Sequence, residues 1–424
     1  MSAFESEFSE FVKLDEMTSD SKIVLMTGGA GFIGSHVSEY LLKRGDKVVI
    51  VDEMNDYYDV RIKQSNLDHL RSFEGCTVYR GDICDVDFMS EVFERERPTH
   101  ICHLAARAGV RPSIVDPYIY VHSNVEGTTR LLDLARQYSC KNFVYASSSS
   151  VYGCSTNAVL SESDIVDKPV SPYAASKKAC ELFAYTFHHL YGLNTTGLRF
   201  FTVYGPRGRP DMAPFKFIDR VYNGHFIQQY GDGSTSRDYT YIDDIVEGVV
   251  ASIDTPLGCE VINLGNGRPC LLSDFISLVE KAVGKKAVIE ILPCQPGDVD
   301  RTCADITKAQ TLLGYAPKVP FEEGIRRTAE WYISAAEGGF FDQDAKSEGS
   351  DADAELDLEL ELAEAEAASY GCKRAEGVGM KSHTPFDESP RSKKGLNHPH
   401  SSDLELSSYV MKSEGQINER VRRF

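Results

Sequence analysis

The chain has 424 residues, of which 42% are hydrophobic and 26% are charged, proportions typical of a folded globular protein. Its formal net charge of −19 is concentrated at the ends, since residues 1–22 contribute −4 and residues 338–424 contribute −7, which leaves −8 between them. This balance excludes a basic nucleic-acid-binding surface, and no apolar run approaches the length that a membrane span requires.

The N-terminal segment, residues 1–21, is acidic and has no apolar stretch, so we expect a disordered extension rather than a secretory signal. The eleven cysteines are scattered, with no CxxC pair and no Cys/His cluster at metal-ligand spacing. We therefore expect free thiols, a reducing cytoplasmic location and no metal site.

The next part of the chain alternates between continuous apolar runs and segments with helical periodicity. This alternation predicts a parallel sheet covered by helices on both faces, the doubly wound arrangement of nucleotide-binding proteins. The expected elements, in chain order, are a strand over 22–27, a helix over 32–45, strands over 47–52 and 76–82, a helix over 86–96, a strand over 100–106, a helix over 113–138, a strand over 142–148 and a helix over 171–192.

After about residue 205 the pattern becomes less regular. Strands are expected over 260–265 and 287–293, and helices near 241–254, 273–283 and 322–337. We expect a Rossmann-type domain over 22–204 that carries the catalytic residues, and a smaller α/β lobe over 205–337 that binds mainly the substrate. Residues 342–366 contain 11 acids and one base, and this composition predicts a disordered acidic tail over 338–424.

The sequence TGGAGFIG follows the first strand and opens the first helix. Gly28 permits a tight turn, Gly31 lets the backbone approach a pyrophosphate, and Gly34 lets the helix pack on the strand. Asp52 ends the second strand, where its carboxylate accepts a ribose 2′-hydroxyl and repels a 2′-phosphate. The sequence therefore predicts NAD rather than NADP as the cofactor.

A second motif, SPYAASKKACELF, places Tyr173 and Lys177 one turn apart at the start of a helix. A phenol has an ordinary pKa of about 10, and a neighbouring ammonium group stabilises the phenolate and makes it a usable base. The spacing alone is common in helices, and it gains meaning from the glycine turn and from the serine-rich strand end YASSSS.

Together these motifs resemble the extended short-chain dehydrogenase/reductase family of NAD-dependent epimerases and dehydratases, over about residues 22–335. The resemblance implies that Ser148, Tyr173 and Lys177 are the catalytic set: Ser148 hydrogen-bonds the reacting hydroxyl, Tyr173 takes its proton, and Lys177 holds the nicotinamide ribose. It also implies cofactor contacts from GDICD, HLAA, NVEGT and the glycine turn, namely Phe32, Ile33, Asp82, Ile83, Leu104, Ala105, Ala106 and Asn124.

The remaining serines indicate the reaction. Sugar-nucleotide dehydratases of this family carry an Asp-Glu pair at the positions of Ser149 and Ser150, and UDP-glucuronate decarboxylases carry Glu at the position of Ser150. Since this chain has neither acid, the resemblance implies an epimerase, which only oxidises and re-reduces its sugar.

The stretch LRFFTVYGPRGRPDMAPFKFID resembles the substrate loop of UDP-glucuronate 4-epimerases, as do RAGVRPSI and NDYYD. A UDP-sugar, most closely UDP-glucuronate, is thus the expected substrate. Thr202, Arg209 and the serines, among them Ser148 and Ser149, would receive its carboxylate; Arg237 and Asp298 would contact the diphosphate and the uridine ribose.

Other readings stay open: a UDP-glucose/UDP-galactose or UDP-pentose 4-epimerase, a UDP-glucuronate decarboxylase, or a non-catalytic NAD-binding scaffold. The chain departs from the family at Arg107, where Gln is frequent, and at Glu53, where Asn is usual. The family also predicts a homodimer through the helices over 113–138 and 171–192. We expect no nucleic-acid or membrane partner.

Overall fold

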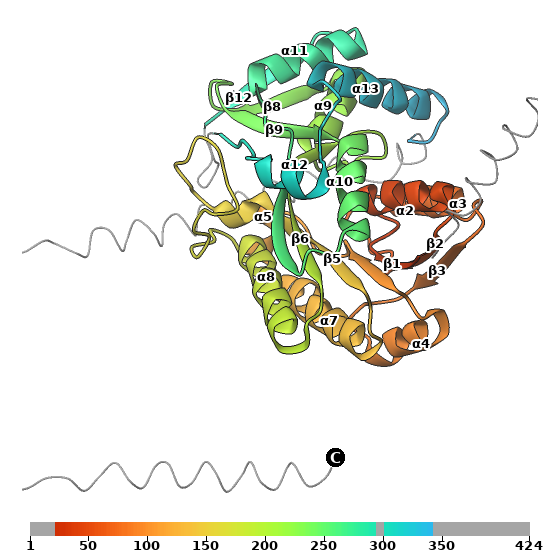
Figure 1. Ribbon diagram of the computed structural model, residues 1–424. Helices are drawn as coiled ribbons and strands as arrows, with labels where there is room; N and C mark the ends of the chain where they lie inside the picture. The colour runs from red at the N-terminus through yellow and green to blue at the C-terminus, as the bar shows by residue number, and fades with distance from the viewer. Residues whose placement is uncertain (1–21, 294–300, 342–424) are drawn as a thin grey trace, which may run out of the picture. The chain divides into compact units, whose positions relative to one another are not determined.

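A seven-stranded sheet forms the centre of the computed structural model, which describes residues 22–293 and 301–341 (Figure 1). All neighbouring strands are parallel, in the order β10-β6-β5-β4-β1-β2-β3. The strands are β1 (Ile23–Thr27), β2 (Lys47–Asp52), β3 (Cys76–Arg80), β4 (His100–His103), β5 (Asn142–Ser148), β6 (Thr195–Phe200) and β10 (Cys259–Leu264). This arrangement confirms the predicted doubly wound α/β fold.

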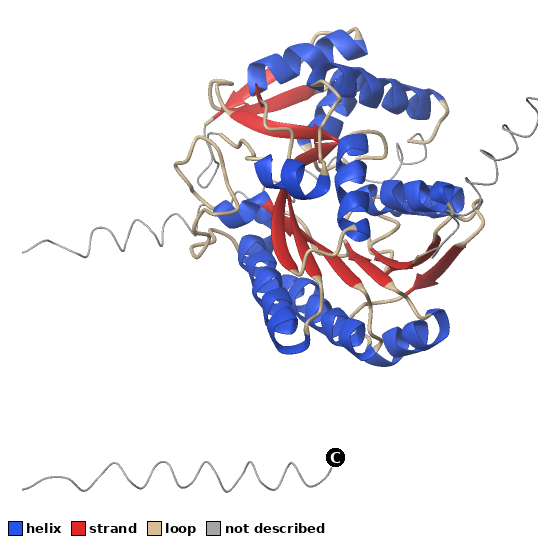
Figure 2. Ribbon diagram, viewed as in Figure 1, coloured by secondary structure: helices blue, strands red, loops and turns tan. Residues whose placement is uncertain are grey.

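Helices cover both faces of the sheet (Figure 2). One face carries α2 (Phe32–Arg44), α3 (Val60–Leu70) and α10 (Ile242–Asp254), and the other carries α4 (Val86–Glu96), α7 (Gly127–Gln137) and α8 (Pro172–Tyr191). Strands β1, β2, β4 and β5 are almost entirely buried, as their continuous apolar runs predict. Helix α2 ends at Gly45, which has a left-handed φ of 97°.

The predicted single helix over 113–138 was wrong. The chain instead forms two short helices, α5 (Val110–Val115) and α6 (Pro117–Tyr120), then a π-helical segment, η1 (Val121–Glu126), and then α7. The break lies at Asp116, which precedes a proline and has a non-helical conformation, φ −127° and ψ 86°. Its carboxylate accepts hydrogen bonds from the backbone amides of Tyr118 and Ile119 and so starts a new helix.

The rest of the chain forms a smaller α/β lobe. It contains a three-stranded sheet of β7 (Thr202–Tyr204), β9 (Ser236–Tyr241) and β11 (Pro269–Leu271), and a parallel pair of β8 (Phe226–Tyr230) and β12 (Val288–Leu292). Its helices are α9 (Ala213–Asn223), α11 (Leu272–Val283), α12 (Thr307–Leu313) and α13 (Phe321–Glu337). Stacked rings fill its core, with centroids 5.1 Å apart for Phe217 and Phe275 and 4.8 Å apart for Tyr239 and Phe321.

Residues after 205 contribute to both parts of the molecule. Strand β10 pairs with β6 at one edge of the large sheet, and α10 packs against α2 on the face of that sheet. The Asn142 side chain, at the start of β5, donates hydrogen bonds to the carbonyl oxygens of Ser252 and Ile253, at 2.9 and 3.1 Å. A domain boundary at residue 205 therefore remains a proposal. Segments from both sides of that residue pack together in the large sheet and its helices.

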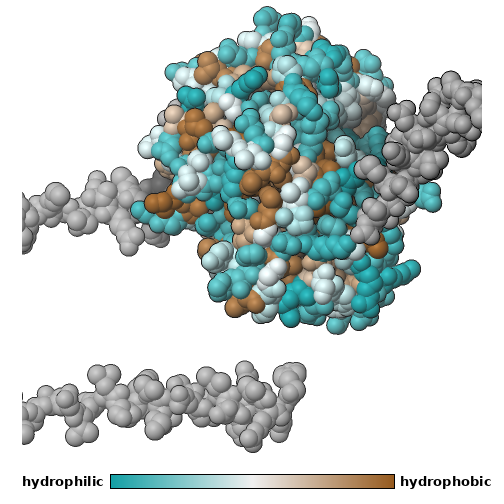
Figure 3. Space-filling view, in the orientation of Figure 1, coloured by the Kyte–Doolittle hydropathy of each residue, from teal (hydrophilic) through white to brown (hydrophobic). Residues whose placement is uncertain are grey.

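The face shown in Figure 3 is mostly hydrophilic, with apolar side chains in small groups. Among the described helices, none combines the length and apolar character needed to cross a membrane. The predicted N-terminal extension and most of the predicted tail lie outside the described residues. Four residues of that predicted tail, 338–341, are described, and the Phe341 ring stacks on Tyr332 with a centroid distance of 5.1 Å.

Candidate active site

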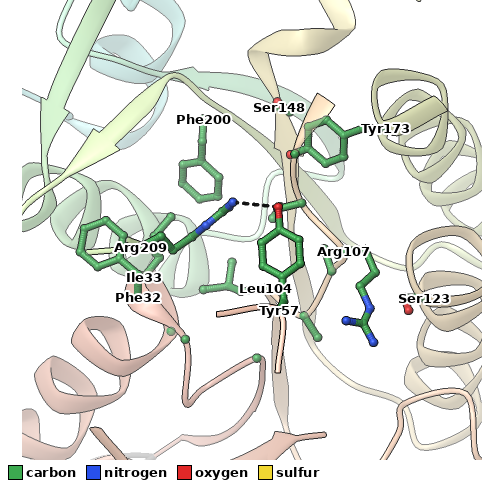
Figure 4. A pocket seen from close by; sticks show the side chains of 18 of the residues that line it. Phe32, Ile33, Tyr57, Leu104, Arg107, Ser123, Ser148, Tyr173, Phe200 and Arg209 are labelled. Carbon is green, nitrogen blue, oxygen red and sulfur yellow. Dashed lines mark hydrogen bonds between the residues drawn. The ribbon is translucent and has the colours of Figure 1, made fainter. Parts of the chain in front are cut away.

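A cavity of about 420 Å³ opens at the carboxyl ends of the parallel strands (Figure 4). This is the edge at which doubly wound sheets bind their ligands. Most of the residues predicted for the site line this cavity: Gly28, Gly31, Phe32, Ile33, Gly34, Asp52, Asp82, Ile83, Leu104, Ala105, Ala106, Ser148, Ser149, Tyr173, Lys177, Thr202 and Arg209, together with Ser150.

The glycine turn between β1 and α2 is shaped to hold a phosphate group. Gly28 has a φ of +69°, and a Cβ there would lie 2.6 Å from the amide nitrogen of Ala105. A Cβ on Gly34 would lie 2.3 Å from the carbonyl oxygen of Gly28. No side chain caps α2, and its first residues face the cavity. The amides at this helix start are therefore placed to bind a pyrophosphate, which fits a dinucleotide.

Asp52 lies at the end of β2 with its carboxylate held in place. Its two oxygens accept hydrogen bonds from the amides of Ala30 and Met54, at 3.1 and 2.9 Å. Burial raises the pKa of this carboxyl, while these amides and the nearby Lys63 favour its charged form. Since each carboxylate oxygen can accept a second hydrogen bond, Asp52 fits the predicted ribose contact.

The two residues that depart from the family pattern contact each other. The Arg107 guanidinium lies 3.2 Å from the Glu53 carboxylate in an ion pair at the cavity wall. The acidic substitution is thus balanced by the basic one, and the local charge of the cofactor pocket is unchanged.

Tyr173 and Lys177 face the cavity from the first turns of α8. Ser171 caps this helix by accepting a hydrogen bond from the amide of Ala174 at 3.1 Å, and Pro172 occupies the first helical position. The Lys177 ammonium group, buried on α8, donates to the carbonyl oxygen of Ala146 on β5 at 2.9 Å. This bond joins α8 to the strand that ends in the serines, and so places Tyr173 near Ser148 (Figure 4).

The four serines have different surroundings. Ser147 borders the cavity, and its hydroxyl donates at 2.8 Å to Glu181, which forms a buried ion pair with Arg199. Ser148 caps the 3₁₀ turn η2 (Ser149–Tyr152), since its Oγ accepts from the Ser150 amide at 3.1 Å. Its hydroxyl also donates to Ser150 Oγ at 3.2 Å. The strand end therefore presents hydroxyl groups, and no carboxylate, to the cavity.

A buried histidine below the site was not predicted from the sequence. His103, on β4, is hydrogen-bonded through its two ring nitrogens to Thr27 and Thr128, at 2.7 and 2.9 Å. Burial, with the nearby Lys177 charge, lowers the pKa of His103 to about 3. It is thus neutral at physiological pH and adds no positive charge beneath Lys177.

Arg209 reaches the cavity from the loop that follows β7. Its Nε and Nη2 donate to the two carboxylate oxygens of Asp211, at 3.0 and 2.5 Å. Nη2 also lies 3.5 Å from the hydroxyl of Tyr57, whose ring packs under the guanidinium (Figure 4). Neither Tyr57 nor Asp211 was predicted as a site residue, although Tyr57 belongs to the quoted motif NDYYD and Asp211 to the quoted stretch LRFFTVYGPRGRPDMAPFKFID.

The same loop is tied to the cofactor-binding helix. Arg207, with a left-handed φ of 62°, donates at 2.7 Å to Glu39 on α2. Its Nε also lies 3.3 Å from a ring nitrogen of His36, one turn nearer the start of the same helix. The position of Arg209 is therefore coupled to helix α2.

Three predicted residues are not part of the described cavity lining. Asn124 is buried behind it and bonds both the amide and the carbonyl oxygen of Arg107, at 2.8 and 3.0 Å. Arg237, on β9, donates to the carbonyl oxygen of Ser236 at 3.0 Å. Asp298 lies outside the described residues.

Comparisons with known proteins point to one family. The family model described as GDP-mannose 4,6 dehydratase matches residues 25–328. A UDP-glucuronate 4-epimerase from Thermodesulfobacterium geofontis is 47% identical over 308 residues, which cover 72% of this chain and 95% of that protein.

Two solved structures resemble the fold over its whole described body. One is UDP-glucuronic acid 4-epimerase from Bacillus cereus in complex with UDP-glucuronic acid and NAD, with a TM-score of 0.69 and 36% identity over 74% of this chain and 99% of that one. The other is UDP-glucose 4-epimerase from Thermotoga maritima with UDP-glucose, with a TM-score of 0.68 and 33% identity over the same shares. The two neighbours differ in their sugar.

Proposed function

Because the chain belongs to the NAD-dependent epimerase/dehydratase family that the GDP-mannose 4,6-dehydratase model describes, we propose that it is a UDP-glucuronate 4-epimerase. It interconverts UDP-glucuronate and UDP-galacturonate by inverting C4 of the sugar, with NAD as its cofactor. The observation that carries this assignment is a cavity that combines the Tyr173–Lys177 pair, an acid-free serine strand end and the Arg209 guanidinium.

Tyr173 is our proposed general base, because its ring faces the cavity one turn from Lys177. Ser148 would hydrogen-bond the 4-hydroxyl, and Lys177 would hold a ribose. When bound in this cavity, NAD would supply the hydride acceptor for oxidation at C4 and the hydride donor for reduction from the opposite face of the sugar. Tyr173 would return the proton in the reduction half, so the chain ends each turnover in its starting state.

Arg209 is our proposed partner for the sugar carboxylate. A planar guanidinium binds a carboxylate through two parallel hydrogen bonds, and Thr202 and the serine hydroxyls line the same cavity. Asp211 occupies one edge of the guanidinium and leaves the other edge for a ligand. Arg237 and Asp298 remain proposals for the diphosphate and uridine contacts.

The alternatives fit less well. The family model carries the name of a dehydratase, but elimination of water needs an acid and a base where Ser149 and Ser150 stand here. A decarboxylase would need a carboxylic acid at Ser150. A UDP-glucose/UDP-galactose epimerase would have no use for the charge of Arg209, because its substrate has no carboxylate. A non-catalytic scaffold protein would have no use for the buried ammonium group of Lys177.

The test is NMR of UDP-glucuronate incubated with the purified protein, with UDP-galactose and UDP-xylose as parallel substrates. We expect UDP-galacturonate to appear until both epimers are present, with no CO₂ and no pentose. Tyr173→Phe, which keeps the ring, is the matched inactive control. Faster turnover of UDP-galactose than of UDP-glucuronate, or release of UDP-xylose, would contradict the proposal.

We also propose that two copies pair through α8 and the helices around α7. Several large apolar side chains are exposed on these elements, more than half exposed in the case of Leu182, Tyr185, Leu190, Tyr191, Tyr118 and Val121. Such a face suits an isologous interface. Light scattering should give twice the chain mass at micromolar concentration; Leu182→Glu should give single chains, and a wild-type monomer would refute the pairing.

A cytoplasmic location is part of the same proposal. Nine cysteines fall within the described residues and all are free thiols, five of them buried, which suits a reducing compartment.

A further inference from the structure

Three side chains with metal-binding atoms meet at one end of the cofactor cleft. Asp82 and Cys84 lie in the turn after β3, and His122 lies in the π-helical segment η1, 40 positions later in the sequence. One carboxylate oxygen, the thiol sulfur and one ring nitrogen all lie within 4.8 Å of one another. Carboxylate, thiolate and imidazole together are typical ligands of Zn²⁺ and related divalent ions.

The first reason to regard this cluster as a site is that its atoms are held in place. Asp82 Oδ1 accepts a hydrogen bond from the Cys84 amide at 2.8 Å, which leaves Oδ2 directed at His122 Nε2, 3.0 Å away. The Cys84 thiol donates to the carbonyl oxygen of His122 at 3.3 Å. The turn and η1 are thus joined through the same groups that would bind an ion.

The second reason is the outer partner of the histidine. His122 Nδ1 lies 3.1 Å from a carboxylate oxygen of Glu126, one helical turn away. Arg130 holds the other oxygen of Glu126, at 2.6 and 3.0 Å. A carboxylate behind a ligating imidazole is the usual outer shell of a metal site, since it fixes the ring and leaves the opposite nitrogen free to ligate.

We propose that Asp82, Cys84 and His122 bind a divalent ion of the Zn²⁺ type, with solvent as the fourth ligand. Tetrahedral bonds of about 2.0 Å to nitrogen and oxygen and about 2.3 Å to sulfur would move Asp82 Oδ2 and His122 Nε2 slightly apart. The same bonds would bring the sulfur closer to these two atoms by less than roughly 1.5 Å. The ion takes the place of the hydrogen bond between Asp82 and His122. It also displaces the proton of the Cys84 thiol, which passes to solvent. It can enter directly, because Asp82 and His122 are 42% and 48% exposed.

The position of the site gives it a consequence for the cofactor. Asp82 and Ile83 also line the cofactor cavity, and the family resemblance implies that both contact the cofactor. An ion on Asp82 Oδ2 removes that oxygen from any contact with the cofactor. Metal binding and NAD binding are therefore antagonistic.

The direct test is titration of the purified protein with Co²⁺, whose thiolate complexes have a charge-transfer absorption that hydrated Co²⁺ lacks, followed by displacement with Zn²⁺. We expect one Co²⁺ per chain with this absorption. Cys84→Ser should abolish it, and His122→Gln should weaken binding at least about tenfold. Cys154→Ser, which removes an exposed cysteine that is not part of the cluster, is the matched control and should bind as the wild type does.

Circular dichroism checks that each variant is folded, and the exposed His122 can be replaced without opening a core. The NAD affinity of the wild type should fall at least about fivefold in saturating Zn²⁺, and that of His122→Gln should not change at the same concentration. No saturable Co²⁺ binding, an absorption that persists in Cys84→Ser, or NAD affinity indifferent to Zn²⁺ in the wild type would overturn the proposal. None of these outcomes depends on which sugar the protein converts.

Discussion

Replacing Arg209 with alanine should reduce activity on UDP-glucuronate far more than activity on UDP-galactose, which has no carboxylate. Truncating one partner of a buried, hydrogen-bonded charge pair costs roughly 2–5 kcal/mol. The Arg209 and Asp211 side chains are 21% and 39% exposed, so solvent screens the charge and we expect the lower end of that range. A loss of about 2 kcal/mol corresponds to a fall of about 30-fold in kcat/KM.

The same change should alter the products. The 4-keto form of glucuronate is a β-keto acid, which loses CO₂ when its carboxylate rotates out of the plane of the ketone. If Arg209 restrains that rotation, Arg209→Ala should release CO₂ and a UDP-4-keto-pentose in a measurable fraction of turnovers. Mass spectrometry of the nucleotide sugars and labelled CO₂ capture measure the two products together.

The structure adds a control that this experiment needs. Arg209→Ala leaves the Asp211 carboxylate without its partner, and that stranded charge would itself repel the substrate. The double variant Arg209→Ala/Asp211→Asn removes it, so the difference between the two variants measures the repulsion. Equal losses on the charged and neutral sugars in the double variant, with no new pentose, would mean that Arg209 only shapes its loop.

Three further predictions test other parts of the molecule. Tyr173→Phe should lower turnover at least about 10²-fold, the usual effect of losing a positioned base, and single-turnover assays showing a smaller loss would remove Tyr173 from that role. Although burial alone would raise it, hydrogen bonds from Lys43 and Arg207 lower the pKa of Glu39 to about 2. Its ionised form therefore stabilises the fold above about pH 4.5 and loses that effect as the pH falls toward about 2. Thermal melts of Glu39→Gln should lie a few degrees below wild type at pH 7, and the two should converge in acid; a constant gap would refute this. Truncation after Phe341 should leave turnover within about twofold of wild type, because the removed segment is too acidic and polar to build a core, and loss of soluble protein would show that it contributes to the body.

The sequence predicted the secondary structure best where the apolar pattern of a segment matched the side chains that the fold buries. The helix over 86–96 and the strand over 142–148 match α4 and β5 at both ends. The helix over 113–138 failed because its apolar spacing was followed through Asp116-Pro117, a pair that starts a new helix. Strand β6 was missed because LRFFTVYG was interpreted only as part of a substrate loop.

The site was predictable to the extent that its residues belong to motifs. The glycine turn, Asp52, Tyr173 and Lys177 all line the cavity, whereas Asn124 and Arg237 do not. The Glu53–Arg107 ion pair and the cluster around His122 depend on contacts between distant segments. Spacing rules for metal ligands examine neighbouring residues, so they cannot detect a ligand that the sheet brings in from 40 positions away.

The place of β10 at the edge of the large sheet has a consequence for synthesis on the ribosome. Domains generally fold as they emerge, N-terminal part first, but here the chain up to β6 leaves one edge of its sheet unpaired. That edge stays open until residues 259–264 have been made and can pair with β6. An unpaired edge strand is a template for aggregation. Between these two points the exposed edge is β6, which is almost entirely buried in the finished protein, whereas β10, the final edge, is half-buried.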